Sequence, residues 1–340
     1  MWGPRLLRFV AMAAITLVSA GPLRAQPDRF YAGKTINMII PIGPGGAYDT
    51  YARLVGRHLG KQITGNPTIV PRNMPGAGGG IASSYLFNAA PQDGTTLIVI
   101  TSTFALDQLL QNSQVKYDGK QFLAIGRLLD TRSILFFSES ASIKTAADLR
   151  LKPSTIAVST LNEVPAVRLR LMNRLLGTQM RLIPGYPSAR DFVLATERGE
   201  TDGGETTYIG IQQLFAPALR GGKLKIVLQF GSSRDPDLKD IPALLEMTDD
   251  PGISQIFRFL VSGDEIGRTL FTTPNVPSTR VDQLRAAFQS MLSDSAFRAD
   301  AERLNLPLSP KAGEDMQKVV SETFDISASA LSRIKELTAK

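Results

Sequence analysis

Two glycine-rich loops carry the residues of this sequence that are best suited to bind an anion. The first spans Gly43 to Gly46, and the second spans Asn73 to Gly80; each follows an apolar run and precedes a helical pattern. Glycine has no Cβ, so its backbone can approach a ligand closely. The helix that follows each loop begins with unpaired N–H groups and a partial positive charge, which favour an anion. We predict that the two loops converge on one carboxylate.

A nucleotide is the first alternative ligand for such loops. The dinucleotide fingerprint GxGxxG would need glycine at Tyr48, and Arg72-Asn73 replaces the acid that binds a ribose. A Walker-type phosphate loop fails as well, because Gly33-Lys34-Thr35 precedes its strand and Asp28 stands where the first glycine should be. Both departures argue against a nucleotide cofactor.

The sequence holds few side chains that could carry out catalysis. It has no cysteine, which excludes disulfides, thiolate catalysis and Cys-ligated metals. Its single histidine, His58, lies in a helical segment without an HExxH motif, and no GxSxG elbow accompanies it. We interpret His58 as a structural residue at a helix surface or interface. The prediction is no catalytic residue, no metal and no cofactor, although an enzyme that uses Asp, Glu, Lys or Tyr stays open.

Polar side chains near the predicted strand ends could complete the anion site. We interpret Asp49 as the N-cap of its helix, because a carboxylate there would repel an anionic ligand unless water or an amino group intervened. In the second half of the chain, Ser159-Thr160, Tyr186, Ser188 and Glu205-Thr206-Thr207 could supply hydroxyl donors and one acceptor. The alternative for each of them is a turn or cap residue.

Alternating strands and helices must position these residues. A chain of 340 residues with 43% hydrophobic content is long enough for about two domains. The predicted strands are 35–41, 68–71, 96–101, 122–129, 134–137, 155–159, 181–183 and 224–230. The predicted helices are 49–63, 81–90, 165–176, 189–197, 279–292 and 313–337, and a further helix starts at 144–149. The stretch 201–207 is polar and contains glycine. Nearly continuous apolar strands alternating with helices are typical of parallel sheets covered on both faces. We predict an α/β fold of two lobes, with the ligand between them.

The first 25 residues have the layout of a cleavable signal peptide. Arg5 and Arg8 precede the apolar stretch 9–20, and small residues offer cleavage after Ala25, which we favour, or Ala20. Twelve apolar residues are too few for a spanning helix, which needs about 20. Cleavage lowers the formal charge from +7 to +4. The remaining basic residues are not clustered, which argues against nucleic acid as a partner.

The motifs PGG-x-x-D and N-x-PGAG, in this order, resemble those of the solute-binding receptors of the tripartite tricarboxylate transporter family, also called Bug-type receptors. They correspond here to 44–49 and 73–78, and the likeness continues through 90–95, 185–187, 197–200, 235–238 and 271–276. It spans essentially the whole mature chain.

The resemblance implies a type II-like periplasmic binding protein that captures a small organic carboxylate and docks on membrane permease subunits. We expect a monomer in the periplasm, whose lobes are open when free and close by a hinge on the ligand. Lobe 1 would comprise 27–128 and 250–340, and lobe 2 would comprise 129–249. The alternatives are a nucleotide- or cofactor-dependent enzyme, and a receptor that reports to a sensor protein instead of a permease.

The resemblance also implies that backbone groups and ordered waters on the two loops hold a ligand carboxylate. The predicted ligand-binding residues are Gly45, Gly46, Tyr48, Asp49, Gly76, Ala77, Gly78, Ser102, Thr103, Ser159, Thr160, Tyr186, Ser188, Glu205 and Thr206. Leu161 and Glu163 depart from the Gly/Ser/Thr-rich loop of the family, and Glu205 stands in a loop that often carries Asp or Asn. An acid at either place would disfavour a second ligand carboxylate and favour an amino or hydroxyl group.

Overall fold

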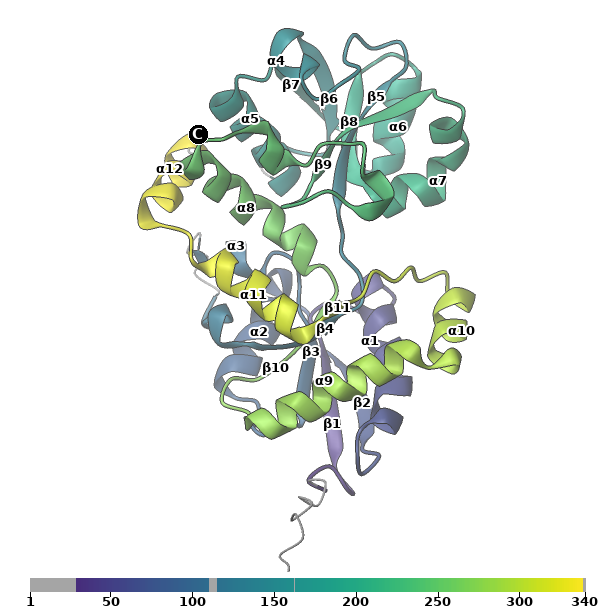
Figure 1. The fold of residues 1–340 in the computed structure, drawn as a ribbon, viewed down its shortest axis with the longest axis vertical. Helices are drawn as coiled ribbons and strands as arrows, with labels where there is room; N and C mark the ends of the chain where they lie inside the picture. Colours follow the sequence, from purple (N-terminus) through teal and green to yellow (C-terminus); the bar gives the residue numbers. More distant parts are fainter. Residues whose placement is uncertain (1–28, 110–114, 162, 339–340) are drawn as a thin grey trace, which may run out of the picture.

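The computed structural model describes residues 29–109, 115–161 and 163–338. Figure 1 shows two lobes, one above the other along the long axis of the molecule, each built around one sheet. The predicted signal peptide, residues 1–25, lies outside the described residues. Within those residues, none of the helices combines the length and the apolar composition that crossing a bilayer demands.

The first lobe contains a six-stranded sheet with the order β11-β4-β10-β3-β1-β2. Its strands are β1 (Thr35–Ile40), β2 (Thr68–Asn73), β3 (Thr96–Val99), β4 (Leu123–Arg127), β10 (Thr269–Thr272) and β11 (Lys311–Ala312). The strands β1, β2 and β3 are parallel, whereas β10 runs antiparallel to β3 and β4. The loops that follow β1, β2 and β3 therefore meet at one edge of the sheet.

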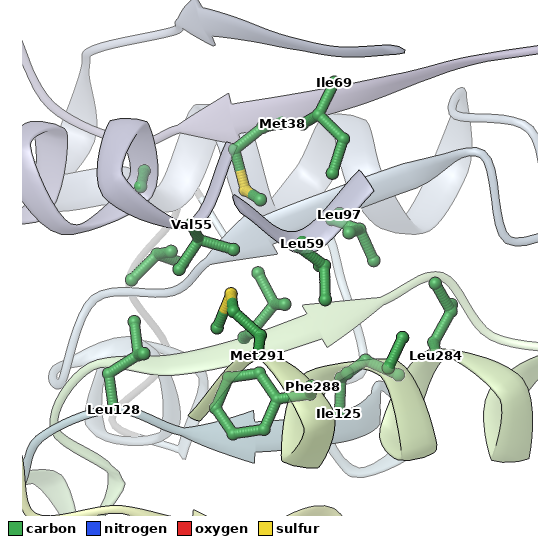
Figure 2. Close-up of a cluster of buried hydrophobic side chains, with 14 of the residues drawn as sticks. Met38, Val55, Leu59, Ile69, Leu97, Ile125, Leu128, Leu284, Phe288 and Met291 are labelled. Atoms are coloured by element: carbon green, nitrogen blue, oxygen red, sulfur yellow. The ribbon is translucent and has the colours of Figure 1, made fainter. Parts of the chain in front are cut away.

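Helices cover both faces of this sheet. They are α1 (Ala47–His58), α2 (Gly80–Asn88), α3 (Phe104–Leu109), α9 (Ser278–Ser293), α10 (Ser295–Arg303) and α11 (Gly313–Phe324). Side chains alternate along β1: Met38 belongs to the apolar cluster beneath α1 and α9, and Ile39 belongs to the cluster on the opposite face. Figure 2 shows the first cluster, in which Met38, Leu97 and Phe288 are buried.

The second lobe contains a five-stranded sheet with the order β7-β6-β8-β5-β9. Its strands are β5 (Ser133–Ser138), β6 (Ser154–Val158), β7 (Met180–Pro184), β8 (Gly203–Thr207) and β9 (Leu224–Phe230), and its helices are α4 (Asp148–Leu151), α5 (Val164–Leu176), α6 (Ala189–Glu197) and α7 (Tyr208–Arg220). Here β6, β7 and β8 are parallel, so the loops after them also share one edge.

The stretch 201–207 was predicted only as polar and glycine-bearing, with Glu205 in a loop, and the loop is wrong because this stretch contains the central strand β8. Glycine is required there by close packing: a Cβ at Gly203 would lie 2.1 Å from the carbonyl oxygen of Phe136, and one at Gly204 would lie 3.0 Å from the ring of Phe136. Glycine in a strand often marks such a close approach.

Several helices were missed or merged in the sequence-based prediction. The structure adds α3, α7, α8 (Pro251–Ile266) and α10, and it divides the predicted helix 313–337 into α11 and α12 (Ala328–Thr338). The division falls before Ser327, whose Oγ accepts a hydrogen bond from the N–H of Ala330. Short 3₁₀ turns lie at Leu59–Gln62, Ala77–Gly79, Gly119–Gln121, Pro236–Leu238 and Leu244–Met247.

The chain crosses between the lobes more than once, as predicted. It passes from the first sheet to the second between β4 and β5, and it returns through α8 between β9 and β10. The apolar face of α8, which includes Phe257 and Leu260, joins the core of the second sheet, as does Ile334 of α12. The exact lobe boundaries stay a prediction, but the two-lobed α/β architecture with crossovers is confirmed.

Candidate functional site

The two glycine loops lie side by side at the carboxyl edge of the first sheet. A Cβ at Gly79 would lie 2.7 Å from Cγ2 of Thr101 and 3.2 Å from Cβ of Pro41. The φ angle of Gly79 is +102°, a value that other residues rarely adopt. The second loop therefore packs directly against the chain that follows β1 and β3, which only glycine permits at this position.

The Asp49 carboxylate holds the two loops together. Its Oδ2 accepts the N–H of Gly45 at 3.0 Å, and its Oδ1 accepts Nε of Arg53 and Nδ2 of Asn73, each at 2.9 Å. Nδ2 of Asn73 also donates to the carbonyl of Ile42 at 2.9 Å. Burial of Asp49 opposes ionisation, but these hydrogen bonds outweigh it and lower the pKa of Asp49 to about 2.

Asp49 therefore has a different structural role from the predicted one. The N-cap of α1 is Gly46, and Asp49 is the third residue of the helix, within its first turn. From there its carboxylate reaches back to the loop, because the loop amides and the Asn73 side chain surround it. Its charge is compensated by the protein itself, so repulsion of an anionic ligand is reduced. Its predicted role as a direct ligand contact remains a prediction.

Free backbone N–H groups gather at the starts of α1 and α2. Within the described residues, the N–H groups of Gly46, Ala47, Gly76, Ala77 and Gly78 donate to no protein group. By contrast, the N–H of Gly45 is taken by Asp49, and the N–H of Gly79 donates to the carbonyl of Gly76 at 3.0 Å. Five unpaired donors on adjacent loops are suited to hold a carboxylate.

Tyr48 connects the first loop to the third. Its hydroxyl accepts the N–H of Ser102 at 3.0 Å, so these two predicted site residues are in contact. Thr103 begins the turn into α3, where its carbonyl accepts the N–H of Asp107 at 2.9 Å. The predicted residues of the first lobe are thus brought together, although the amide of Ser102 is already used.

The predicted residues of the second lobe mostly bond to their own loops. The Ser159 hydroxyl donates to Glu163, the Tyr186 hydroxyl lies 3.3 Å from Glu200, and the Ser188 hydroxyl caps α6. The carbonyl of Ser159 accepts the N–H of Gly185 at 3.2 Å, which joins the loops after β6 and β7. Thr160 is exposed, and Thr206 lies in β8. Among the described residues, no hydrogen bond joins the predicted sites of the two lobes.

Glu205 lies in β8 instead of a loop, and its carboxylate is buried beside a cation. Arg168 of α5 forms an ion pair with Glu205 and a second one, at 2.9 Å, with Asp264 of α8. The Arg168 guanidinium also lies 4.0 Å from the centre of the Phe230 ring. Burial raises the pKa of Glu205 to about 7, although the charge of Arg168 opposes this shift, and burial raises the pKa of Asp264 too. Two acids thus share one guanidinium.

Glu205 should make the stability of the protein depend on pH. Its folded pKa of about 7 lies above the usual 4.5, so the stability that protonated Glu205 contributes is complete below about pH 4.5 and is lost as pH rises through 7. We expect Glu205→Gln to flatten the fall in unfolding free energy between pH 5 and 8, measured by urea denaturation. The control Glu302→Gln changes an exposed acid on α10, and its unfolding free energy should fall with pH as in the wild type. An unchanged slope in Glu205→Gln would contradict this assignment.

A cavity of about 370 Å³ lies between the lobes, next to the predicted site. It is lined by Ala47, Tyr51, Leu129, Asp130, Thr131, Arg132, Thr207, Tyr208, Ile209, Gln212, Asp235, Asp237, Arg268 and 305–309. None of the predicted ligand-binding residues lines it, but Ala47 adjoins Gly46, and Thr207 adjoins Thr206. A ligand site between the lobes was predicted, but the residues that line this cavity were not, because they come from segments that are distant in sequence.

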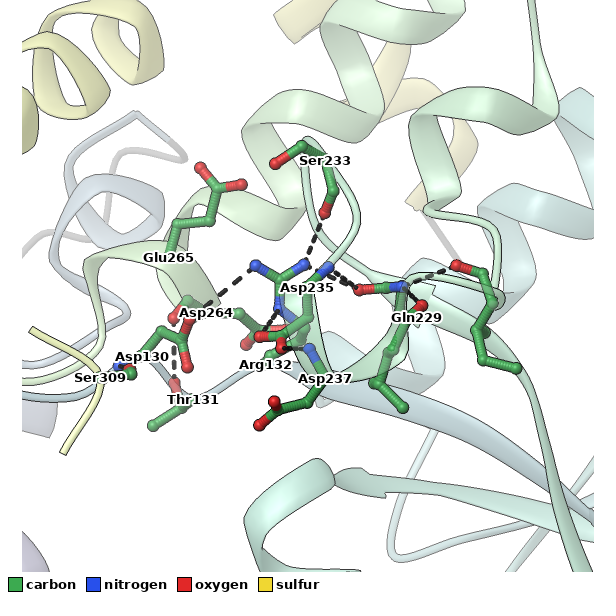
Figure 3. Close-up of polar contacts among 12 residues, drawn as sticks. Asp130, Thr131, Arg132, Gln229, Ser233, Asp235, Asp237, Asp264, Glu265 and Ser309 are labelled. Atoms are coloured by element: carbon green, nitrogen blue, oxygen red, sulfur yellow. Dashed lines mark hydrogen bonds and ion pairs between the residues drawn. The ribbon is translucent and has the colours of Figure 1, made fainter. Parts of the chain in front are cut away.

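Figure 3 shows polar contacts of residues 128–132, which connect β4 to β5, with one another and with the segment at and after the end of β9. Arg132 donates to Gln229 at 3.0 Å and to the carbonyl of Ser233 at 2.6 Å, and it forms ion pairs with Asp130 and Asp235. These contacts fix the segment that connects the lobes.

The single histidine is part of a contact between helices. Nε2 of His58 lies 2.9 Å from Oδ2 of Asp300, which joins α1 to α10 and fits the structural interpretation. Within the ranges that the structure describes, no group of three or more His, Asp or Glu side chains is placed to hold a metal.

Comparison with known proteins finds relatives in sequence and in structure. No family model matches it. A UPF0065 protein from the tcbD-tcbE intergenic region of Pseudomonas sp. strain P51 is 23% identical over 258 residues, which are 73% of this chain and 72% of that protein. BugT of Bordetella pertussis is 34% identical over 101 residues, 30% of each chain.

Solved structures share the fold over nearly the whole chain. A TctC solute-binding protein from Polaromonas matches 90% of this chain and 98% of its own, with a TM-score of 0.69 and 18% identity. MatC from Rhodopseudomonas palustris with bound malate matches 90% and 99%, with a TM-score of 0.51 and 23% identity. A further R. palustris protein with adipate matches 89% and 97%, with a TM-score of 0.53 and 19% identity. The relatives and the fold agree with the resemblance found in the motifs.

Proposed function

We propose, from the premise that the chain is a Bug-type solute-binding receptor, that it captures a small carboxylate between its lobes for a tripartite tricarboxylate-type transporter. The observation that carries this proposal is the set of five unpaired N–H groups on the two loops, held in place by Asp49 and Asn73. Backbone donors of this kind neutralise an anion without a reactive side chain. The protein binds its ligand and does not transform it.

Binding begins on the first lobe in this account. The loops after β1 and β2 are packed against each other before the ligand arrives, so the carboxylate meets donors that are already oriented. Closure of the second lobe requires contacts that exist only in the closed state. Within the part of the chain that the structure describes, the hydroxyls of Thr160 and Thr206 make no hydrogen bond with the protein, and they are suited to this step.

The location and the partner follow from the same premise. The amino-terminal segment with Arg5 and Arg8 would direct the chain across the inner membrane and be removed after Ala25. The closed receptor would then dock on membrane permease subunits as a monomer. We propose residues 27–128 with 250–340 as lobe 1 and 129–249 as lobe 2, with α8 and α12 packed against the core of the second sheet.

Calorimetry combined with solution scattering tests the proposed function. We expect the mature protein to bind malate or adipate, the acids found in two structural neighbours, with a dissociation constant near 1 μM, about −8 kcal/mol. Binding should reduce the radius of gyration, and 1,6-hexanediol, which has the chain of adipate but no carboxylate, should neither bind nor cause closure. If a panel of small carboxylates gives no heat and no change in scattering, the protein is not a carboxylate receptor.

A further inference from the structure

Arg268 lines the cavity between the lobes from a fixed position. It lies between the end of α8 at Ile266 and the start of β10 at Thr269. Its N–H donates to the carbonyl of Leu129 at 2.7 Å, and its carbonyl accepts the N–H of Leu128 at 3.0 Å. The backbone of Arg268 is therefore paired with the segment through which the chain crosses from the first lobe to the second.

Among residues 29–109, 115–161 and 163–338, no acid forms an ion pair with the guanidinium of Arg268. It lies 3.8 Å from the centre of the Tyr48 ring, a cation–π contact that holds its plane. Its Nε is buried without a hydrogen-bond partner, and within the described parts of the chain its side chain forms no ion pair. The residue as a whole is half-buried. The guanidinium therefore has donors that an anionic ligand in the cavity could use.

The other charged residues of the cavity differ from Arg268. Arg132 forms ion pairs with Asp130 and Asp235, and it donates hydrogen bonds to Gln229 and to the carbonyl of Ser233. Two of the acids are thereby neutralised, because Asp130 also lies 3.5 Å from Arg127 and Asp235 lies 3.3 Å from Arg132. Asp237 is an exposed acid, so it is well solvated. Arg268 is thus the arginine of this cavity that is available to an incoming anion.

We propose that Arg268 binds a carboxylate of the ligand, and that the ligand is therefore a dicarboxylate. One carboxylate would lie on the amides that begin α1 and α2, and the other would pair with the planar fork of Arg268. Tyr48 links both places, since it belongs to the first turn of α1 and its ring contacts the guanidinium of Arg268. The acid at Glu205 does not oppose a second carboxylate, because its charge is buried against Arg168. This inference rests on the proposed function.

Paired acids that differ by one carboxylate test this inference. Calorimetry would compare adipate with hexanoate, and malate with 2-hydroxybutyrate, on the wild type and on Arg268→Gln, Arg268→Lys and the control Arg181→Gln. Arg181 is an exposed arginine on β7 that does not line the cavity, so its substitution removes the same charge elsewhere. We expect Arg268→Gln to weaken the dicarboxylate about 10- to 100-fold and the monocarboxylate less than about threefold.

The lysine variant and the wild type separate the other outcomes. Arg268→Lys keeps the positive charge but loses the planar fork of the guanidinium. Its affinity for the dicarboxylate should therefore lie between those of Arg268→Gln and the wild type. An equal loss of affinity for the dicarboxylate and the monocarboxylate in Arg268→Gln would show that Arg268 only supports Tyr48. Unchanged affinity in Arg268→Gln would also overturn the inference. Both results leave the receptor function intact. A wild type that binds none of the four acids would instead overturn the proposed function, and this inference with it. Unfolding midpoints of all variants establish that each is folded.

Discussion

Replacement of Arg168 by methionine should lower the free energy of unfolding by about 3–5 kcal/mol, because it leaves two buried acids without their cation. Arg168 is almost fully buried and pairs with Glu205 of β8 and Asp264 of α8. Urea denaturation at pH 8 measures the loss, which should be smaller at pH 5, where Glu205 is protonated.

A matched substitution and a double variant sharpen this expectation. Arg181→Met removes an exposed arginine and should change stability by less than about 0.5 kcal/mol. Adding Glu205→Gln to Arg168→Met should recover part of the lost stability, since one of the unpaired charges disappears. A loss below about 1 kcal/mol in Arg168→Met at pH 8 would show that the pair does not hold α5, β8 and α8 together.

Asp49→Ala is expected to weaken carboxylate binding at least about 100-fold. The substitution releases the N–H of Gly45 and the side chains of Arg53 and Asn73, which together hold the two loops. Without this frame the loop amides must be ordered when the ligand binds, which costs affinity. Calorimetry with malate and adipate gives the change.

The control for Asp49 is another acid of the first lobe. Asp282→Ala removes an exposed carboxylate from α9 and should leave the affinity within about twofold. The affinity of Asp49→Asn should lie between those of the wild type and Asp49→Ala, because the asparagine side chain keeps one acceptor oxygen but carries no charge. If Asp49→Ala remains folded and its affinity for the carboxylate is within threefold of that of the wild type, the arrangement of the loops does not depend on Asp49.

Regular apolar patterns allowed much of the fold to be predicted. The predicted strand 224–230 coincides with β9, and 35–41 differs from β1 by one residue, because a continuous apolar run in a sheet covered on both faces has few alternatives. The strand β8 was missed since Gly203 and Gly204 have no apolar side chain to mark it. Asp250 and Pro251 mark the start of α8, a helix-start pattern that the sequence analysis overlooked.

The site was predictable only where it follows from local sequence. The glycine loops belong to consecutive β-α units, so parallel strand order alone brings them to one edge. The role of Asp49 was only partly foreseen, because the backbone of the loop decides whether an acid caps from the first or a later helical position. Arg268 was not foreseen at all: its neighbours Tyr48 and Leu129 are far from it in sequence, and no local pattern marks it.

Glycine-selective ¹⁵N labelling, followed by NMR titration with adipate or malate, tests most directly whether the loop amides hold the ligand. The chain contains 29 glycines, so the spectrum is small enough to resolve individual signals. We predict large downfield shifts of the Gly46, Gly76 and Gly78 amide protons, and little change at Gly177, which ends α5 in an open turn. Ligand binding by calorimetry without any shift at Gly46, Gly76 and Gly78 would contradict the account.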